Sequence, residues 1–265
     1  MPTIRDLASL QDYTDCVALQ EATWGAGFSE RVPTAILRVS QMIGGVSAGA
    51  FEPDGRMAGF VFGMTGVRNG QLVHWSDMLA VREELRGKGI GARLKQYQRE
   101  KVVALGVTSM LWTFDPLQAR NAHFNINILG ALPESYQPDL YGSSTGSALH
   151  GALPTDRFIV RWDLDREHAF HQRELADSPA VLANPTNGGD LPFVTDITHE
   201  HPAFRVQVPS DHATVRDDTE SALRWRLVVR EVVQNLLSRG YTVTGFQRPA
   251  VGHPSYLFHR TAKET

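Results

Sequence analysis

Cysteine is almost absent from this chain of 265 residues, which contains Cys16 alone. An internal disulfide is therefore excluded, and its absence is typical of proteins that work in a reducing compartment. Apolar residues at helical spacing surround Cys16, so we expect this thiol to pack in the core rather than to react.

Long apolar segments are also absent. No run of about 20 apolar residues, the length that a membrane-spanning helix needs, occurs in the sequence. The first residues lack the apolar segment of a secretory signal peptide. We therefore expect a cytoplasmic protein without a membrane anchor.

Charge of one sign is not in excess. Lysine and arginine number 26, aspartate and glutamate 29, and the formal net charge is -3. This balance gives no field that would attract nucleic acid or an anionic membrane. The 42% of hydrophobic residues can form a substantial core, and the length fits two domains or one domain with a large extension.

Residues 78 to 94 carry the clearest functional pattern. An apolar strand that ends at Val81 leads into a charged turn, then into glycines at alternate positions, Gly87, Gly89 and Gly91, and into a helix that begins at Ile90. The first N–H groups of a helix lack intrahelical partners and carry a partial positive charge. Because glycines leave these groups accessible to an anion, the pattern predicts a phosphate-binding loop.

Three kinds of phosphate loop can be compared with this pattern. A Walker loop is excluded because Gly89, not serine or threonine, follows Lys88. The dinucleotide fingerprint matches Gly87-x-Gly89-x-x-Ala92, with Asp115 where a ribose-binding acid is sought, so an NAD-binding enzyme stays open. The third motif, Gln/Arg-x-x-Gly-x-Gly/Ala, belongs to acyl-CoA N-acyltransferases, and Arg86-Gly87-Lys88-Gly89-Ile90-Gly91 matches it at every position. On these residues the chain resembles the GNAT superfamily, over residues 1 to 163.

The resemblance implies an α/β fold of the α+β kind. Its mixed sheet is flanked by helices, and two central strands splay apart. We expect a catalytic domain over residues 1–164, a linker over 165–190 and a smaller α/β extension over 191–265. Nothing in the extension resembles the phosphate loop, so a packing or dimerisation role is favoured over a second acyltransferase unit, and a homodimer is left open.

The hydrophobic periodicity predicts the individual elements. We expect helices over residues 9–24, 33–42, 90–105, 120–129 and 220–239, and strands over residues 48–51, 58–64, 71–81, 109–114, 136–141, 157–163, 204–208, 241–246 and 255–259. Residues 142–147, rich in glycine and serine, are a candidate substrate-gating loop.

By resemblance, the co-substrate is acyl-CoA, with acetyl-CoA or succinyl-CoA as donor, and no metal is required. Its pantetheine arm would lie along the backbone of Leu79, Ala80 and Val81, and a free N–H near Leu79 would polarise the thioester carbonyl. The pyrophosphate would bind to the phosphate loop, and the helix expected over residues 120–129 would contribute asparagines. The expected cofactor-binding residues are Leu79, Ala80, Val81, Arg86, Gly87, Lys88, Gly89, Ile90, Gly91, Ala92, Asn121 and Asn125.

The implied reaction is direct attack of an amine on the thioester. Asp77 is the candidate base, with His74 as alternative; for each, a purely structural role stays open. Ile126 occupies the position where the family commonly has a proton-donating tyrosine, so the acid is unassigned. Tyr136 or Tyr141 could supply this proton.

The candidate acceptor site includes an arginine. Arg157, next to Asp156, suits bidentate capture of a substrate carboxylate, although a surface ion pair is an equal alternative. Trp24 and Asn127 are further substrate-binding candidates, with core packing the other reading of Trp24. Segments around residues 112–123 and 153–157 resemble a GNAT branch thought to acylate amino acids, in some members with succinyl-CoA.

These observations predict an acyl-CoA-dependent N-acyltransferase that transfers an acetyl or succinyl group directly to the amine of a small acceptor. A small-molecule acceptor such as an amino acid is the expected partner, with no nucleic acid or membrane. The alternatives are a catalytically silent CoA-binding module whose C-terminal half binds a partner, and the NAD-binding enzyme.

Overall fold

The computed structural model describes residues 1–142, 146, 153–165, 180–186, 191–210 and 218–260. These residues form two compact units. Unit 1 contains residues 1–112, 146 and 162–165, and unit 2 contains residues 113–142, 153–161, 180–186, 191–210 and 218–260.

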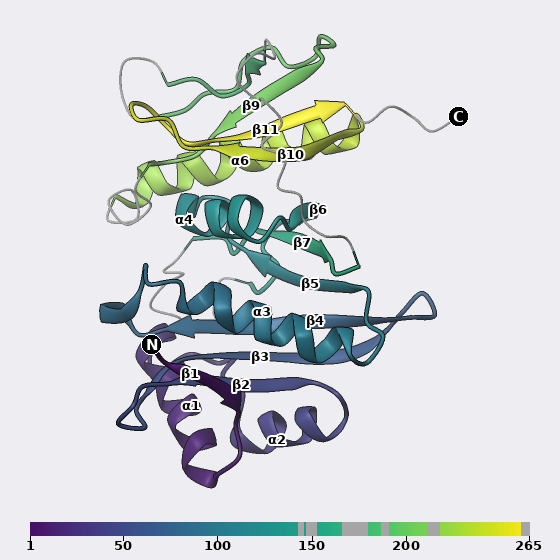
Figure 1. Ribbon diagram of the computed structural model, residues 1–265. Helices are drawn as coiled ribbons and strands as arrows, with labels where there is room; N and C mark the ends of the chain where they lie inside the picture. The colour runs from purple at the N-terminus through teal and green to yellow at the C-terminus, as the bar shows by residue number, and fades with distance from the viewer. Residues whose placement is uncertain (143–145, 147–152, 166–179, 187–190, 211–217, 261–265) are drawn as a thin grey trace. The chain divides into compact units, whose positions relative to one another are not determined.

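Unit 1 holds most of the N-terminal half of the chain (Figure 1). Its elements, in chain order, are β1 (Thr3–Asp6), α1 (Leu10–Trp24), α2 (Thr34–Met42), β2 (Val46–Phe51), β3 (Met57–Arg68), β4 (Gln71–Val81), the short 3₁₀ turn η1 (Glu83–Leu85), α3 (Ile90–Val103) and the start of β5 (Ser109–Phe114). The sequence predicted all the main helices and strands except β1, whose short polar sequence has no apolar alternation to reveal it.

The larger sheet is mixed, as the sequence predicted. Its strand order is β1-β2-β3-β4-β5-β7-β6, and β1 to β4 pair antiparallel. β4 and β5 run parallel and pair at His74 with Met110 and at Trp75 with Leu111. β3 is buried along its first half, which explains its continuous apolar run and its central place in the sheet.

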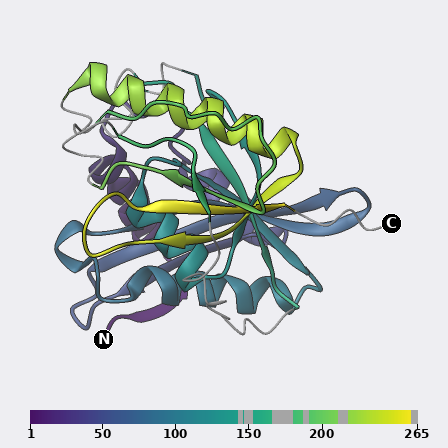
Figure 2. The same ribbon diagram turned by 90° about the horizontal axis from the view of Figure 1, so that it is seen from above.

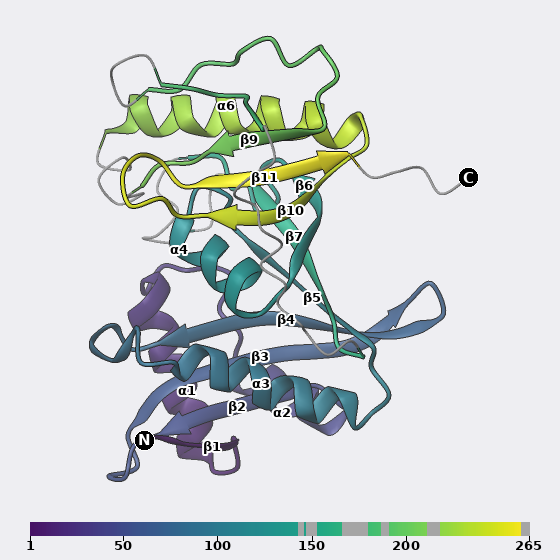
Figure 3. The same cartoon turned by 45° about the horizontal axis from the view of Figure 1, so that its top comes forward.

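Helices cover both faces of the unit 1 sheet (Figure 3). α3 lies across one face, and α1 and α2 lie against the other. α1 begins with a capping box in which the Ser9 hydroxyl accepts from the Asp12 N–H and the Asp12 carboxylate accepts from the Ser9 N–H. The buried side chains of α1 and α2 form one hydrophobic cluster with β2 to β4, and Cys16 lies in it as predicted.

Unit 2 holds the remaining elements. They are the end of β5, α4 (Ala119–Ala122), the π-helix η2 (His123–Ile128), β6 (Leu132–Gln137), most of β7 (Arg157–Asp163), β8 (Val181–Leu182), β9 (Ala203–Gln207), α6 (Thr219–Ser238), β10 (Tyr241–Gln247) and β11 (Ser255–Arg260). The prediction of a strand over 136–141 was wrong, because β6 lies earlier and ends before Pro138. Proline has no N–H for the ladder, and Asp139 then takes a positive φ of 46°.

The C-terminal segment forms a second, four-stranded sheet with the order β10-β11-β9-β8. α6 packs on this sheet and is capped by the Asp218 carboxylate (Figure 2). Its buried residues recur at helical spacing, so the sequence predicted this helix well. No helix in the described ranges combines the length and the apolar character that crossing a membrane requires.

The expected boundary at residue 164 does not coincide with the division into units. Residues 113–142 and 153–161 cluster with the C-terminal segment rather than with the phosphate loop. The extension over 191–265 as a separate domain stays a prediction. Most of the expected gating loop and of the expected linker lies outside the described residues.

Candidate active site

The glycine-rich loop lies at the N-terminus of α3, as the sequence predicted. β4 ends at Val81, η1 follows, and Gly89 is the N-cap residue of α3. Gly87 and Gly89 have φ angles of 78° and 76°, in the left-handed region that glycine adopts without steric cost. The local backbone therefore requires glycine at both positions.

This loop leaves space and hydrogen-bond donors for an anion. A Cβ atom added at Gly87 or Gly89 would meet nothing within 4 Å. Within residues 1–142, no carbonyl or side chain accepts a hydrogen bond from the backbone N–H groups of Gly87 to Gly91. Arg86 and Lys88 are exposed beside it. The residues thus fit a phosphate or diphosphate group, which the helix N-terminus would stabilise.

β4 contains a bulge at Asp77. Phe62 of β3 pairs with Met78 and Gly63 pairs with Ser76, so Asp77 has no opposite residue on β3. The extra residue shifts the alternation of side chains. Ser76 before the bulge bonds to α3, whereas Met78 after it packs in the cluster formed with α1.

β4 and β5 separate just before this bulge. Their pairing ends at Trp75 and Leu111. Leu79, Ala80 and Val81 pair with β3 on their other side. Parallel strands that part at their carboxyl ends, next to a helix N-terminus, form the usual ligand-binding edge of an α/β sheet.

Asp77 has an exposed side chain next to the indole of Trp75, whose Nε1 donates to Asp77 Oδ1 at 3.2 Å. Surrounding protein atoms raise the pKa of Asp77 through partial desolvation, and the negative Glu30 acts in the same direction, while the Trp75 hydrogen bond opposes both. A raised pKa brings the group closer to the range of a useful base.

Trp24 stacks on Phe28 at 5.7 Å and meets the edge of Phe60 at 6.3 Å between ring centroids. These contacts place it beside the hydrophobic cluster of unit 1. They account for Trp24 by packing, and its role in substrate binding stays a prediction.

His74 is fully buried and has both ring nitrogens engaged. Nδ1 lies 3.0 Å from Thr65 Oγ1, and Nε2 lies 3.0 Å from Gln98 Nε2. Burial, with a smaller contribution from nearby Lys95, lowers the pKa of His74 to about 3. A histidine so enclosed is a poor candidate for the base.

Sequence reasoning missed Lys95, which belongs to the same network. Its Nζ donates to Ser76 Oγ at 2.6 Å and lies 3.7 Å from the ring centroid of Trp112. The side chain is 2% exposed, and burial lowers its pKa well below the usual value. The available signal was a polar pair, Lys95 and Gln98, on the face of α3 that also carries the apolar residues Ile90, Leu94 and Val102.

The remaining predicted residues lie in unit 2. Arg157 is buried rather than at the surface, so a surface ion pair with Asp156 was the wrong alternative. Its Nη1 lies 3.8 Å from Asp115 Oδ2, and its guanidinium lies 5.4 Å from the ring centroid of Tyr141. Burial lowers the pKa of Arg157, and Asp115 acts against this effect.

Two acidic residues near Arg157 are paired with arginines of α6. Arg226 donates to both oxygens of Asp115 at 2.8 Å, and Arg230 donates to both oxygens of Asp156 at 2.8 and 2.6 Å. Asp115 is thus held by a bidentate pair, which does not favour its role as a ribose-binding acid.

The two candidate tyrosines differ. Tyr136 is buried, and its hydroxyl donates to Asp156 at 2.5 Å; burial and the negative Asp156 raise its pKa. This phenol is engaged in the fold. The hydroxyl of Tyr141, an exposed residue, lies 2.9 Å from Thr113 Oγ1. Tyr141 is the more accessible proton donor, and its role stays a prediction.

The helix with the asparagines consists of α4 and η2. Asn121 is exposed and Asn125 is buried. Asn127 Nδ2 lies 2.9 Å from His123 Nδ1 and donates to the carbonyl of Phe246 at 3.0 Å, which ties η2 to β10. The ligand contacts predicted for the three asparagines stay predictions.

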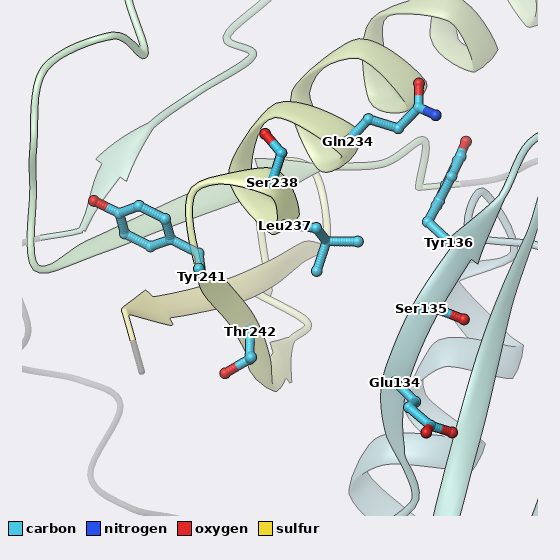
Figure 4. Close-up of a pocket in the computed structure, with 9 residues that line it drawn as sticks. Glu134, Ser135, Tyr136, Gln234, Leu237, Ser238, Tyr241 and Thr242 are labelled. Atoms are coloured by element: carbon cyan, nitrogen blue, oxygen red, sulfur yellow. The ribbon is translucent and has the colours of Figure 1, made fainter. Parts of the chain in front are cut away.

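A shallow hollow of about 530 Å³ also lies in unit 2 (Figure 4). It is lined by residues of β6, by the end of α6 and by the start of β10, and it includes Tyr136 but no residue of the phosphate loop. Among the residues that the structure describes, no group of histidine, cysteine, aspartate or glutamate is placed to hold a metal ion.

Comparisons with known proteins point to one family. Residues 18–125 match the family described as "Acetyltransferase (GNAT) family". No curated protein matches the chain. A putative GNAT acetyltransferase of Desulfovibrio desulfuricans is 19% identical, with a TM-score of 0.50, over 62% of this chain and 99% of that one.

A second solved structure, a putative acetyltransferase of Salmonella typhimurium with acetyl-CoA, is 19% identical over 64% of this chain and 97% of that one. Its TM-score is 0.47. At these identities a structural likeness shows the fold alone. The fold and the family match agree: residues 18–125 match the GNAT acetyltransferase family, and the chain has the fold of these enzymes.

Proposed function

We propose that this protein is an acyl-CoA-dependent N-acyltransferase that transfers an acetyl or succinyl group directly to the amine of a small acceptor, such as an amino acid. One observation carries the proposal. A helix N-terminus with accessible N–H groups and left-handed glycines follows a strand that is bulged at Asp77 and parts from its parallel neighbour.

Each part of this arrangement has a task in the proposed reaction. The N–H groups at the start of α3 bind the diphosphate of CoA, and the backbone of Leu79 to Val81 binds the pantetheine arm. A backbone N–H after the bulge stabilises the oxyanion of the thioester carbonyl. Holding donor and acceptor together supplies most of the rate, since orientation contributes roughly 7–11 kcal/mol.

The acceptor is a cation at neutral pH and must lose a proton before it attacks. Asp77, whose pKa is raised, takes this proton. Arg157 is the candidate partner of an acceptor carboxylate, because a guanidinium binds a carboxylate in a bidentate manner. The cytoplasmic location and a homodimer stay predictions.

Ligand binding separates this function from the alternatives. In a thermal-shift titration we expect CoA, acetyl-CoA and succinyl-CoA to stabilise the protein, and NAD to have no effect. Ligand at 100 times its dissociation constant adds about 2.7 kcal/mol to the unfolding free energy. Stabilisation by NAD alone would overturn the proposal. Thiol release with a panel of amines then distinguishes an enzyme from a silent CoA-binding module.

The variant Gly89→Glu tests the loop. We expect it to abolish CoA binding, measured by calorimetry, because the carboxylate fills the anion site and repels the diphosphate. Gly70→Glu is the matched control, since Gly70 also has a φ of 76° and open space around its Cβ position but lies in the β3–β4 turn. The site is refuted if Gly89→Glu and Gly70→Glu bind CoA equally.

A further inference from the structure

Lys95 lies where β4 and β5 part. The last pair between the strands joins Trp75 to Leu111. The next residues along the two strands are Ser76 and Trp112, and the Lys95 amine contacts both, at 2.6 Å from Ser76 Oγ and 3.7 Å from the Trp112 ring centroid. One amine therefore occupies the apex of the opening between the strands.

The surroundings of this amine favour its neutral form. The Ser76 hydroxyl donates a hydrogen bond to Gln98 Oε1 at 2.8 Å, so its oxygen accepts a hydrogen bond from Lys95 Nζ. Within the part of the chain that the structure describes, no carboxylate forms an ion pair with Lys95. Removal from water without a counter-ion disfavours the ammonium form and lowers the pKa of Lys95, while the face of the Trp112 ring acts in the opposite direction. A neutral amine can accept a proton and return it.

We propose that Lys95 is a catalytic residue that carries a proton from the attacking nitrogen to the departing sulfur. This inference rests on the proposed function, because only that function places a thioester in the opening. It also assigns a proton donor, since the family's tyrosine position holds Ile126, a buried apolar residue that cannot supply a proton. The accessible Tyr141 is the competing candidate for this role.

The protons balance in this scheme. Asp77 takes the first proton from the acceptor ammonium, and the free amine forms a bond to the acyl carbon. The attached nitrogen, now positive, gives its second proton to the neutral Lys95 Nζ. The carbon–sulfur bond breaks, and the sulfur takes this proton from Lys95. An amide and a thiol result, Lys95 is neutral again, and Asp77 releases its proton to water.

Other titratable groups near the apex do not fit this task. His74 is separated from Lys95 by Gln98 and Ser76, and an amide side chain does not pass on protons readily. Asp77 is the bulged residue of β4 and has no partner residue on β3. Its carboxylate accepts from the indole of Trp75, whereas Ser76 bonds to α3.

The central variant is Lys95→Met, which keeps an unbranched side chain of nearly the same length and removes the amine. We expect kcat to fall by about 10²–10⁴-fold, the usual range for acid–base groups, with the dissociation constant of CoA unchanged. Lys95→Arg should not restore kcat, because a guanidinium stays protonated. The control is Lys101→Met on the same helix, an exposed lysine paired with Asp6, which should keep wild-type kcat.

Nuclear magnetic resonance of ¹³C-labelled lysine gives a test that does not depend on activity or on the folding of a variant. We expect the Lys95 signal of the wild-type protein to show a neutral amine at pH 7. A cationic Lys95, or a Lys95→Met variant with wild-type kcat, overturns the inference while the proposed function stands. Failure of the wild-type protein to bind CoA overturns both.

Discussion

At the scale of single residues, unit 1 buries a chain of polar side chains with a defined direction. The Thr65 hydroxyl donates to the carbonyl of Gly44 at 2.6 Å, so it accepts from His74 Nδ1. His74 Nε2 therefore accepts from the Gln98 amide, whose oxygen accepts from Ser76. Each hydrogen has one acceptor, so the neutral form of His74 is built into the fold.

The buried His74 predicts a loss of stability in mild acid. Its pKa is about 3 in the folded protein and about 6.5 in the unfolded chain, so the unfolded state binds more protons between these values. The unfolding free energy should fall as the pH drops below about 6.5, by at most about 1.4 kcal/mol per pH unit from this residue. Urea unfolding from pH 7.5 to 5 measures the slope.

The variant His74→Gln should have a shallower slope over this pH range. His199→Gln, at an exposed position, serves as control and should keep the wild-type slope. An unchanged slope in His74→Gln would show that another group is responsible.

At the scale of elements, the bulged pairing of β3 with β4 depends on a small residue opposite Ser76. A Cβ at Gly63 would lie 2.3 Å from His74 Nε2, 2.6 Å from the carbonyl oxygen of Trp75 and 2.7 Å from Gln98 Nε2. Glycine here lets α3 reach β4 through Gln98, next to the apex occupied by Lys95. The site therefore depends on a residue with no side chain.

Gly63→Ala should lower the unfolding free energy by about 1–3 kcal/mol, the usual cost of overpacking a well-filled interior. Gly66→Ala is the matched control on the same strand, because a Cβ there would meet nothing within 4 Å. Chemical denaturation of both variants measures the difference. Equal stability of the two variants would contradict the close packing around His74.

At the scale of the whole molecule, the C-terminal segment is integral to unit 2. α6 supplies Arg226 and Arg230 to acidic residues at the end of β5 and just before β7. Tyr256 of β11 donates to the carbonyl of Pro116 at 2.7 Å. Contacts between residues more than 70 positions apart in sequence thus fix the end of β5 and the start of β7, where Arg157 lies.

Arg226→Met should lower the unfolding free energy by about 3–5 kcal/mol, because it leaves the Asp115 carboxylate without its bidentate partner. Adding Asp115→Asn should recover part of this loss, since a buried carboxylate that has lost its bidentate partner is then replaced by a neutral amide. Arg224→Met, at an exposed position of the same helix, is the control. Additive losses in the double variant would contradict direct coupling between the two residues.

The sequence by itself determined the features that depend on neighbouring residues. The phosphate loop follows from glycines at a helix start, and α1, α3, β4, β5 and α6 follow from apolar spacing, capping and breaker residues. These signals are local, because backbone conformation and the first turn of a helix depend on a few adjacent residues.

Only the tertiary structure decided which polar side chains meet. The bulge at Asp77 exists because β3 and β4 pair in a particular register, and Lys95 reaches Ser76 and Trp112 because α3 crosses the sheet there. The pairing of Asp115 with Arg226 joins residues 111 positions apart. Such contacts depend on how the elements pack. The spacing of residues along one strand or helix predicts which side chains share a face, but it does not identify the residues of other elements that this face contacts.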